Sequence, residues 1–587
     1  MMNIRNTPVL VLLLLAACAH TTVPAPVEQA ESDHVQAADT AVLAVQPAEE
    51  PAQDYPKIEL TGQMLYQFLL SDIAAQRGHP ELAIQGYLDL AKSTRDLRVV
   101  RRAAQLAYES RQMDETIEAF KLWNALDPKA ALPKQMLTTV YLSGGMLTEA
   151  KPFLVDLLAA DPSDAGHVVV QVYPLLARNA GKEAVYQLLV EVTRPYLALK
   201  QEELHWVLAQ AASAAGHADV ALAEARKARA IRPDWEMAVL LEAQQLHASD
   251  PQQAMQISRD FLAAHDDANE LRMYYARLLL ERKQYEASRA QFRELLKHQP
   301  GNADVAFAIA LLSIQMGELD KAESELKQTL AVGGKDPSTV HFYLAQLQEA
   351  KKDDAAAMAE YQKITEGEYV FQSRLRMAYL LAKQKKLTEA GELLHATKAR
   401  NSQQRAQLVL TEAQLLRDAK KYDQAFKVVS KGLEQQPNQP DLLYEAGMIA
   451  DKLGKFDVTE KMLKQLIKVA PSHAHAYNAL GYAMMERRER LPEAMQLVEK
   501  AYQLAPDDAA IMDSMGWGYY LTGNLSKSLE FMRRAYAAYR DPEIAAHLGE
   551  VLWQSGSREE AKKVWQQSLL ENPGNPVLQS VMNRLMH

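Results

Sequence analysis

Two short motifs in this chain of 587 residues contain residue types that perform catalysis in other proteins. Ser324 and Lys327 have the Ser-x-x-Lys spacing in which a serine acts as the nucleophile, but the partner motifs of that chemistry are absent. Leu326 between them fits a packing position of a helix. The segment 333–335 (Gly-Gly-Lys) lacks the spacing and the hydroxyl residue of a phosphate-binding loop. Both segments are therefore predicted to be structural, as a solvated helix face and a turn.

A metal site needs several ligands on one surface, and the histidines do not supply them. His473 and His475 are two residues apart, and such neighbours do not share a helix face. No third ligand is near in the sequence, and a single cysteine excludes both an internal disulfide and a thiolate-rich zinc site. We therefore expect no metal, no cofactor and no catalytic residue, and we expect that the protein is not an enzyme.

Composition and charge exclude other classes of protein. The formal net charge of −10 argues against a general nucleic-acid binder, which needs a basic face. After the N-terminal segment no apolar run reaches the roughly 18 residues of a membrane-spanning helix, so a polytopic membrane protein is excluded. Hydrophobic residues at 48% and charged residues at 24% are typical of a folded, soluble body.

The only cysteine, Cys18, follows an N-terminal targeting segment. Residues 1–17 combine a basic start, an apolar run and two alanines, which is typical of a secretory signal peptide. The segment 15–18 (Leu-Ala-Ala-Cys) resembles the lipobox of bacterial lipoproteins. That resemblance implies cleavage before Cys18 and acylation of the cysteine by fatty acids such as palmitate. Ala19, where aspartate would signal inner-membrane retention, implies the outer membrane. A plain signal peptide with an incidental cysteine is the alternative.

Residues 18–56 form the next predicted segment. They contain five prolines and seven acidic residues, with no lysine or arginine. Low hydrophobicity with charge of one sign predicts a disordered linker. The linker would tether the folded body to the membrane at a distance, on the periplasmic side.

A period of about 34 residues begins near residue 60. Pro437 and Pro471 are 34 residues apart, and Pro471 and Pro506 are 35 apart. When each unit is numbered so that its closing proline is position 32, positions 8 and 20 are small and position 24 is bulky. Small side chains at positions 8 and 20 allow the two helices of a unit to approach closely. The position-8 residues are Ala104, Ala209, Ala276, Ala310, Ala345, Ala378, Ala413, Gly447, Gly481, Gly516 and Gly549.

This period and these positions resemble the tetratricopeptide repeat, a helix–turn–helix unit. The resemblance implies an all-α superhelical solenoid of roughly fifteen helix pairs over residues 57–574, with a C-terminal capping helix over 575–587. The repeats leave no room for a separate catalytic domain. Function is therefore expected to come from surfaces that bind proteins.

In tetratricopeptide repeats, fixed positions of the first helices line a concave groove. The resemblance implies groove candidates in the last three full units, and the large ones are Tyr482, Met485, Trp517, Tyr520 and Trp553. Large aromatic side chains on such a surface anchor a partner peptide or helix. The alternative is that Trp517 and Trp553 pack between helices as core.

Arg98 and Arg101 occupy groove positions near the other end of the array. A basic surface there would bind a carboxylate or an acidic segment of a partner. The alternative is a solvated helix face whose charges are neutralised by neighbouring acids.

The segments 65–70 (Leu-Tyr-Gln-Phe-Leu-Leu), 74–78 (Ala-Ala-Gln-Arg-Gly) and 91–96 (Ala-Lys-Ser-Thr-Arg-Asp) carry a second resemblance. With the linker before them they resemble the long outer-membrane lipoproteins that partner a carboxyl-terminal processing protease. The resemblance implies an adaptor that holds a periplasmic protease and its protein substrates, such as peptidoglycan hydrolases. It implies no nucleic-acid partner and no small-molecule substrate. The alternative is a scaffold for the export or assembly of an envelope polysaccharide or pilus.

Overall fold

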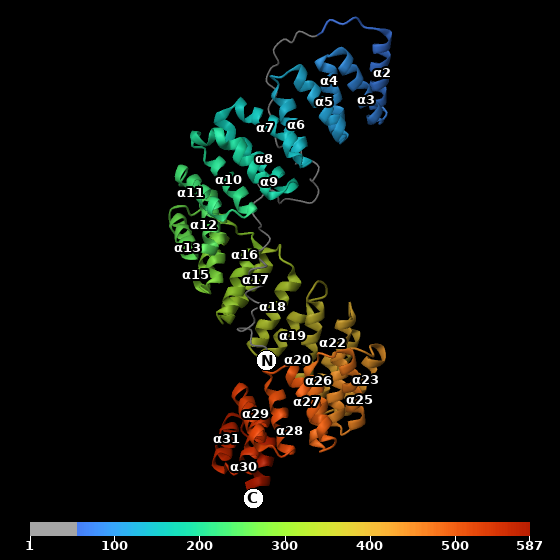
Figure 1. Cartoon of the computed structure of the whole chain (residues 1–587), viewed down its shortest axis with the longest axis vertical. Helices are drawn as coiled ribbons and strands as arrows, with labels where there is room; N and C mark the ends of the chain where they lie inside the picture. Colours follow the sequence, from blue (N-terminus) through green and yellow to red (C-terminus); the bar gives the residue numbers. More distant parts are fainter. Residues whose placement is uncertain (1–55, 587) are drawn as a thin grey trace. The chain divides into compact units, whose positions relative to one another are not determined.

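The computed structural model describes residues 56–586, which contain helices and no β-strand. Cys18, the predicted signal peptide and almost all of the predicted linker lie outside the described residues. None of the described helices combines the length and the apolar character needed to cross a bilayer. The chain divides into two compact units, of which the first ends at Lys335 and the second begins at Asp336 (Figure 1).

Consecutive helices of the first unit form hairpin pairs, each joined by a short turn. The pairs are α2 (Gly62–Gln76) and α3 (Pro80–Thr94), α4 (Leu97–Glu109) and α5 (Met113–Leu126), α6 (Ala131–Ser143) and α7 (Leu147–Ala160), α8 (Ala165–Asn179) and α9 (Lys182–Thr193), α10 (Glu202–Ala215) and α11 (Ala218–Ile231), α12 (Glu236–Ser249) and α13 (Pro251–Ala264), α14 (Asn269–Glu281) and α15 (Tyr285–His298), and α16 (Ala303–Gln315) and α17 (Leu319–Val332). Two 3-10 helices, η3 (Pro162–Asp164) and η4 (Arg194–Leu199), flank the α8–α9 pair.

The second unit continues the same pattern and closes with a single helix. Its pairs are α18 (Pro337–Ala350) and α19 (Asp354–Gln362), α20 (Val370–Lys383) and α21 (Leu387–Ala396), α22 (Ser402–Asp418) and α23 (Tyr422–Gln435), α24 (Pro440–Lys452) and α25 (Phe456–Val469), α26 (Ala474–Glu486) and α27 (Leu491–Leu504), α28 (Ala509–Leu521) and α29 (Leu525–Ala538), and α30 (Pro542–Gln554) and α31 (Arg558–Glu571). The last helix, α32 (Pro576–Met586), packs on α30 and α31. The prediction of an all-α fold of roughly fifteen helix pairs is confirmed.

The small residue at position 8 allows a bulky side chain from the second helix of the same pair to lie against the backbone of the first. A Cβ atom on Gly516 would lie 2.7 Å from Cγ of Met532, and one on Gly481 would lie 2.6 Å from Cγ2 of Val498. A Cβ atom on Gly549 would overlap the indole of Trp565, which is fully buried. The bulky position 24 therefore fills its own hairpin.

The turns within the pairs contain residues in the left-handed region of the backbone, which glycine adopts readily. Gly454 and Gly523 end their helices at φ angles of 69° and 85°. Glycine adopts this region without steric cost, so it terminates the first helix and reverses the chain. The next pair then begins with a capped helix, as at Asp508, whose Oδ1 accepts a hydrogen bond of 3.0 Å from the N–H of Ile511.

The contact between Gly549 and Trp565 yields a stability prediction. Gly549→Ala should destabilise the protein by about 1–3 kcal/mol, because the added methyl group forces the buried indole out of its position. Gly301→Ala is the matched control, since a Cβ atom there meets nothing within 4 Å. Urea unfolding followed by circular dichroism measures both variants. An unchanged transition in Gly549→Ala would show that this close approach does not limit the packing of the pair.

Candidate functional site

The first helices of the last three pairs, α26, α28 and α30, pack side by side and bring polar and aromatic groups together. His547 of α30 is the centre of this group. Its Nδ1 lies 2.8 Å from Oδ2 of Asp513 on α28, and its Nε2 lies 3.4 Å from the hydroxyl of Tyr482 on α26. The imidazole also stacks on the Trp517 ring, with the centroids 4.4 Å apart and the planes at 24°. One imidazole therefore links three successive hairpins.

The pair of His547 and Asp513 is almost completely buried, with exposed fractions of 7% and 6%. Burial lowers the pKa of His547, but the carboxylates of Asp513, Glu543 and Glu486 outweigh it, so the pKa lies above its ordinary value. The protonated form is therefore favoured in the folded protein. It can donate from Nδ1 to Asp513 and from Nε2 toward the Tyr482 oxygen.

The carboxylates around His547 also act on Tyr482. Burial raises the pKa of the Tyr482 hydroxyl, and the negative charges of Glu486, Glu543 and Asp513 raise it further. Glu486 and Glu543 are themselves exposed. We call this surface the acidic first-helix face and define it as Tyr482, Glu486, Asp513, Trp517, Tyr520, Glu543 and His547.

Three of the predicted groove residues lie on this face. Tyr482, Trp517 and Tyr520 are each half-buried, and the rings of Trp517 and Tyr520 are 5.1 Å apart. The indole Nε1 of Trp517 has no hydrogen-bond partner in the described part of the chain. The packing alternative for Trp517 holds in part, because the ring stacks on His547. Whether these residues bind a partner stays a prediction.

The other two groove candidates lie elsewhere. Met485 is 1% exposed and belongs to the core. Gly518 on the neighbouring first helix has no side chain, and Sδ of Met495 and Cε of Met485 fill the space, 2.3 and 2.6 Å from where a Cβ atom on Gly518 would be. The prediction that Met485 faces a groove is therefore corrected. Trp553 is half-buried against its own hairpin, 5.8 Å from the Trp565 ring and 5.1 Å from the guanidinium of Arg558.

The guanidinium groups of Arg98 and Arg101 already interact with neighbouring side chains of this chain. Arg98 is exposed and forms a two-bond ion pair with Asp96, at 2.6 and 3.0 Å, which lowers the pKa of that carboxyl. Arg101 lies 5.1 Å from the ring of the buried Trp123. These contacts support the alternative of a helix face stabilised locally. Binding of a partner carboxylate remains a prediction for both arginines.

Sequence reasoning missed one surface, on the first described helix. Nine of the 21 exposed large apolar side chains in the described part lie between residues 58 and 82, so this end of the array is unusually apolar. We define the α2 apolar face as Leu65, Tyr66, Phe68, Leu69, Leu70 and Ile73, which are 39–68% exposed. The signal was present in the segment 65–70, where apolar residues follow one another so closely that they occupy the exposed side of the helix as well as the packed side.

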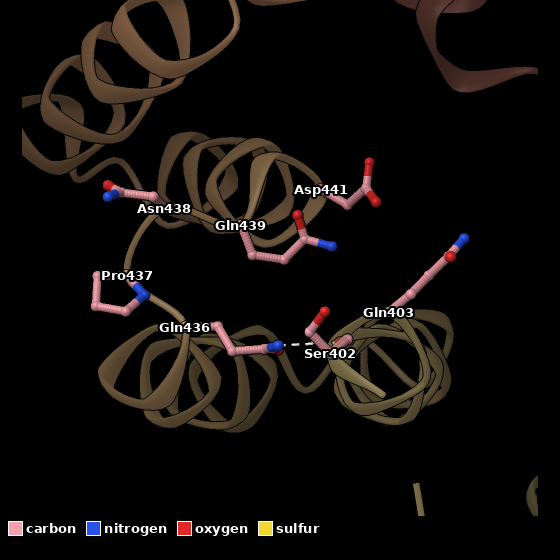
Figure 2. A pocket seen from close by; sticks show the side chains of 7 residues that line it. All are labelled: Ser402, Gln403, Gln436, Pro437, Asn438, Gln439 and Asp441. Atoms are coloured by element: carbon pink, nitrogen blue, oxygen red, sulfur yellow. Dashed lines mark hydrogen bonds between the residues drawn. The ribbon is translucent and has the colours of Figure 1, made fainter. Parts of the chain in front are cut away.

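An open hollow in the second unit is lined by six polar residues and one proline (Figure 2). It lies where the start of α22 meets the connection between α23 and α24, and the side-chain amide of Gln436 donates to the carbonyl of Ser402 across it at 2.9 Å. Its other lining residues are Gln403, Pro437, Asn438, Gln439 and Asp441. The hollow holds no nucleophile paired with a base. In residues 56–586 no group of histidines and carboxylates is arranged to hold a metal ion.

Comparison with known families identifies the repeat. Two family models described as tetratricopeptide repeat match the chain, one over residues 245–303 and 444–509 and the other over 280–346. Tetratricopeptide repeats bind other proteins, and scaffolds built from them are generally not enzymes. The matched segments cover less than half of the chain, and the repeats in them suggest a scaffold that binds proteins.

Relatives with known names share parts of the chain. The TPR repeat-containing protein PA4667 of Pseudomonas aeruginosa is 38% identical over 210 residues, which is 36% of this chain and 36% of that protein. The human protein O-mannosyl-transferase TMTC1 is 20% identical over 173 residues, or 28% of this chain and 19% of that protein. The chain thus matches well under two thirds of the length of either relative.

Solved structures with related repeats each match less than half of the chain. A tetratricopeptide repeat protein from Parabacteroides merdae matches 43% of this chain and 99% of its own, at 13% identity and a TM-score of 0.35. A thermophilic TPR protein from Thermus thermophilus matches 32% of this chain and 99% of its own, at 23% identity and a TM-score of 0.29.

The raised pKa of His547 predicts a pH-dependent stability. The stabilisation from the pair with Asp513 is fully present below about pH 6.5, the ordinary pKa of histidine, and is lost as the pH rises through the raised value of the folded protein. The difference in unfolding free energy between the wild type and His547→Gln should therefore be larger at pH 5.5 than at pH 8.5. His475→Gln, at a histidine whose side chain is 53% exposed, is the control. A difference that does not change with pH would contradict the ion pair.

Proposed function

We propose that this tetratricopeptide-repeat protein is a lipoprotein of the outer membrane, facing the periplasm, that brings a carboxyl-terminal processing protease to its substrates. The substrates would be cell-wall hydrolases, and the protein itself would carry out no catalysis. The lipobox at residues 15–18 and the resemblance of the segments 65–70, 74–78 and 91–96 to LbcA, the lipoprotein partner of such a protease, support this proposal.

The α2 apolar face is the observation on which the proposal depends most. The terminal repeat of a solenoid needs a polar outer surface to remain soluble. Here α2 carries a single charged residue, Asp72, and buries only Ser71 and Ala74. Tyr66, Leu69 and Ile73 lie at i, i+3 and i+7 on the helix and are 68%, 49% and 47% exposed. An exposed apolar stripe of this kind is typical of a helix surface that a protein partner covers.

The mechanism would be proximity. If one surface holds the protease and another holds the substrate, the second encounter becomes intramolecular. The effective concentration then rises toward the millimolar range without any new chemical group. Acyl chains on Cys18 would confine the complex to the membrane surface facing the cell wall.

The α2 apolar face gives a direct test. Replacing Tyr66, Leu69 and Ile73 together by serine should weaken binding of the purified carboxyl-terminal processing protease at least about tenfold, because the loss of three buried apolar contacts is worth several kcal/mol. Biolayer interferometry with the immobilised full-length chain measures the dissociation constant. The matched control replaces Leu504, Tyr539 and Leu570, which are also exposed, by serine.

Two outcomes separate the possibilities. Equal weakening of protease binding in both variants, or unchanged protease binding in both, would contradict a specific role for α2. Circular dichroism of each variant checks that the helices remain formed, so that reduced binding reports on the surface and not on unfolding.

Anchoring by acyl chains is tested separately. Cys18→Ala should abolish incorporation of labelled palmitate and move the protein from the outer-membrane fraction to the soluble periplasmic fraction, because the residue that carries the acyl chains is removed. Fractionation of cells grown with labelled palmitate measures both effects. If Cys18→Ala stays membrane-bound and labelled, the lipoprotein assignment is wrong.

A further inference from the structure

The acidic first-helix face carries negative charge that the described residues do not neutralise. Glu486 ends α26, and Glu543 lies in the first turn of α30. Both are exposed, and neither forms an ion pair with a lysine or arginine in residues 56–586. Glu486 lies four residues after Tyr482 on α26, and Glu543 lies four residues before His547 on α30. Because Tyr482 contacts His547, both carboxylates lie within about one helical turn of the same contact, and both act electrostatically on its two groups.

A buried acceptor contacts the same histidine. Asp513 is 6% exposed, and its Oδ2 is occupied by His547, whereas its Oδ1 has no hydrogen-bond partner among the described residues. Oδ1 of Asn478, on the same side of α26, is also without a partner. Buried acceptors are nearly always paired, because an unpaired one loses its hydration without compensation. A group that pairs with these two acceptors is therefore a donor, whereas the buried indole Nε1 of Trp517 on the same face lacks an acceptor.

Two arginines, Arg584 and Arg488, act on the Tyr520 hydroxyl of this face. Arg584 of α32 forms an ion pair of 2.5 Å with the buried Glu550. Burial and the charge of Glu550 raise the pKa of the Tyr520 hydroxyl, and the charges of Arg584 and Arg488 lower it. The charges of Glu486 and Glu543 thus remain uncompensated even when His547 is protonated and neutralises Asp513.

Aromatic rings complete the arrangement. Tyr482, Trp517 and Tyr520 are half-buried and present ring surface between the two exposed carboxylates. A cation over an aromatic ring gains about 0.5–2 kcal/mol, and the gain is larger when a carboxylate accepts a hydrogen bond from the same cation. An acidic ligand would be repelled here, and an apolar one would leave the carboxylates and the orphan acceptor unpaired.

We propose that the acidic first-helix face binds a lysine or arginine side chain of a protein partner, with the cation between Glu486 and Glu543 and against the rings of Tyr482 and Trp517. This inference rests on the scaffold function proposed above and names the chemistry of one partner segment. Such a segment presents an exposed basic residue on an extended or helical stretch.

The test uses the full-length protein and two capped, fluorescein-labelled alanine octapeptides, one with two lysines and one with two glutamates. Fluorescence anisotropy should show binding of the lysine peptide, which weakens as salt is added, and no binding of the glutamate peptide. Glu486→Gln combined with Glu543→Gln should raise the dissociation constant at least about tenfold. Glu499→Gln combined with Glu530→Gln, on the second helices α27 and α29, removes the same charge from exposed positions and should leave binding unchanged.

Three results would overturn the inference: absence of lysine-peptide binding to the wild type, equal weakening in both glutamine variants, or binding of the glutamate peptide. The proposed function fails in a different way, through protease binding that is independent of the α2 apolar face. The two glutamine variants should still bind the protease through α2. Loss of peptide binding with retained protease binding therefore supports the inference without depending on the α2 result.

Discussion

The close approach of two helices within each hairpin is the constraint from which the rest of the structure follows. At Gly447, Gly481, Gly516 and Gly549 a bulky side chain of the second helix lies where a Cβ atom would otherwise be. Because that contact sets the spacing of the pair, each repeat buries its apolar side chains against itself and its neighbours. The interior residues therefore serve to pack the helices together. The features that distinguish this chain from other arrays of the same fold lie on its surfaces.

The network around His547 shows what a buried polar group does in such an array. Leucine or alanine would have filled the same place between α28 and α30 with less cost of desolvation. The imidazole and Asp513 instead fix the register of two first helices through directional bonds, while their burial concentrates charge beneath Tyr482. The same carboxylates that hold the imidazolium also make the surface above it attractive to a cation, so stability and recognition depend on one set of charges.

The repeat and its pairing could be predicted from the sequence because they depend on period and side-chain size. The small residues at position 8, such as Ala310 and Gly516, identified the hairpin contact without any structure. The exposure of surface side chains was harder to predict from the sequence, because it depends on neighbours one repeat away. Met485 has the position of a groove residue, yet the absence of a side chain at Gly518 leaves a space that it fills. His547 was missed because its partner, Asp513, is 34 residues earlier, at nearly the same place in the preceding unit.

The α2 apolar face and the acidic first-helix face differ in physical character, and this difference matters for a scaffold. The α2 apolar face has one charged residue on its helix and would bind through burial of apolar area, which salt does not weaken. The acidic first-helix face would bind through charge and would lose affinity as salt rises. A partner selected by one mechanism has little affinity for the other surface. Two proteins can then occupy the array together without competing, and this is the condition under which tethering raises their effective concentration.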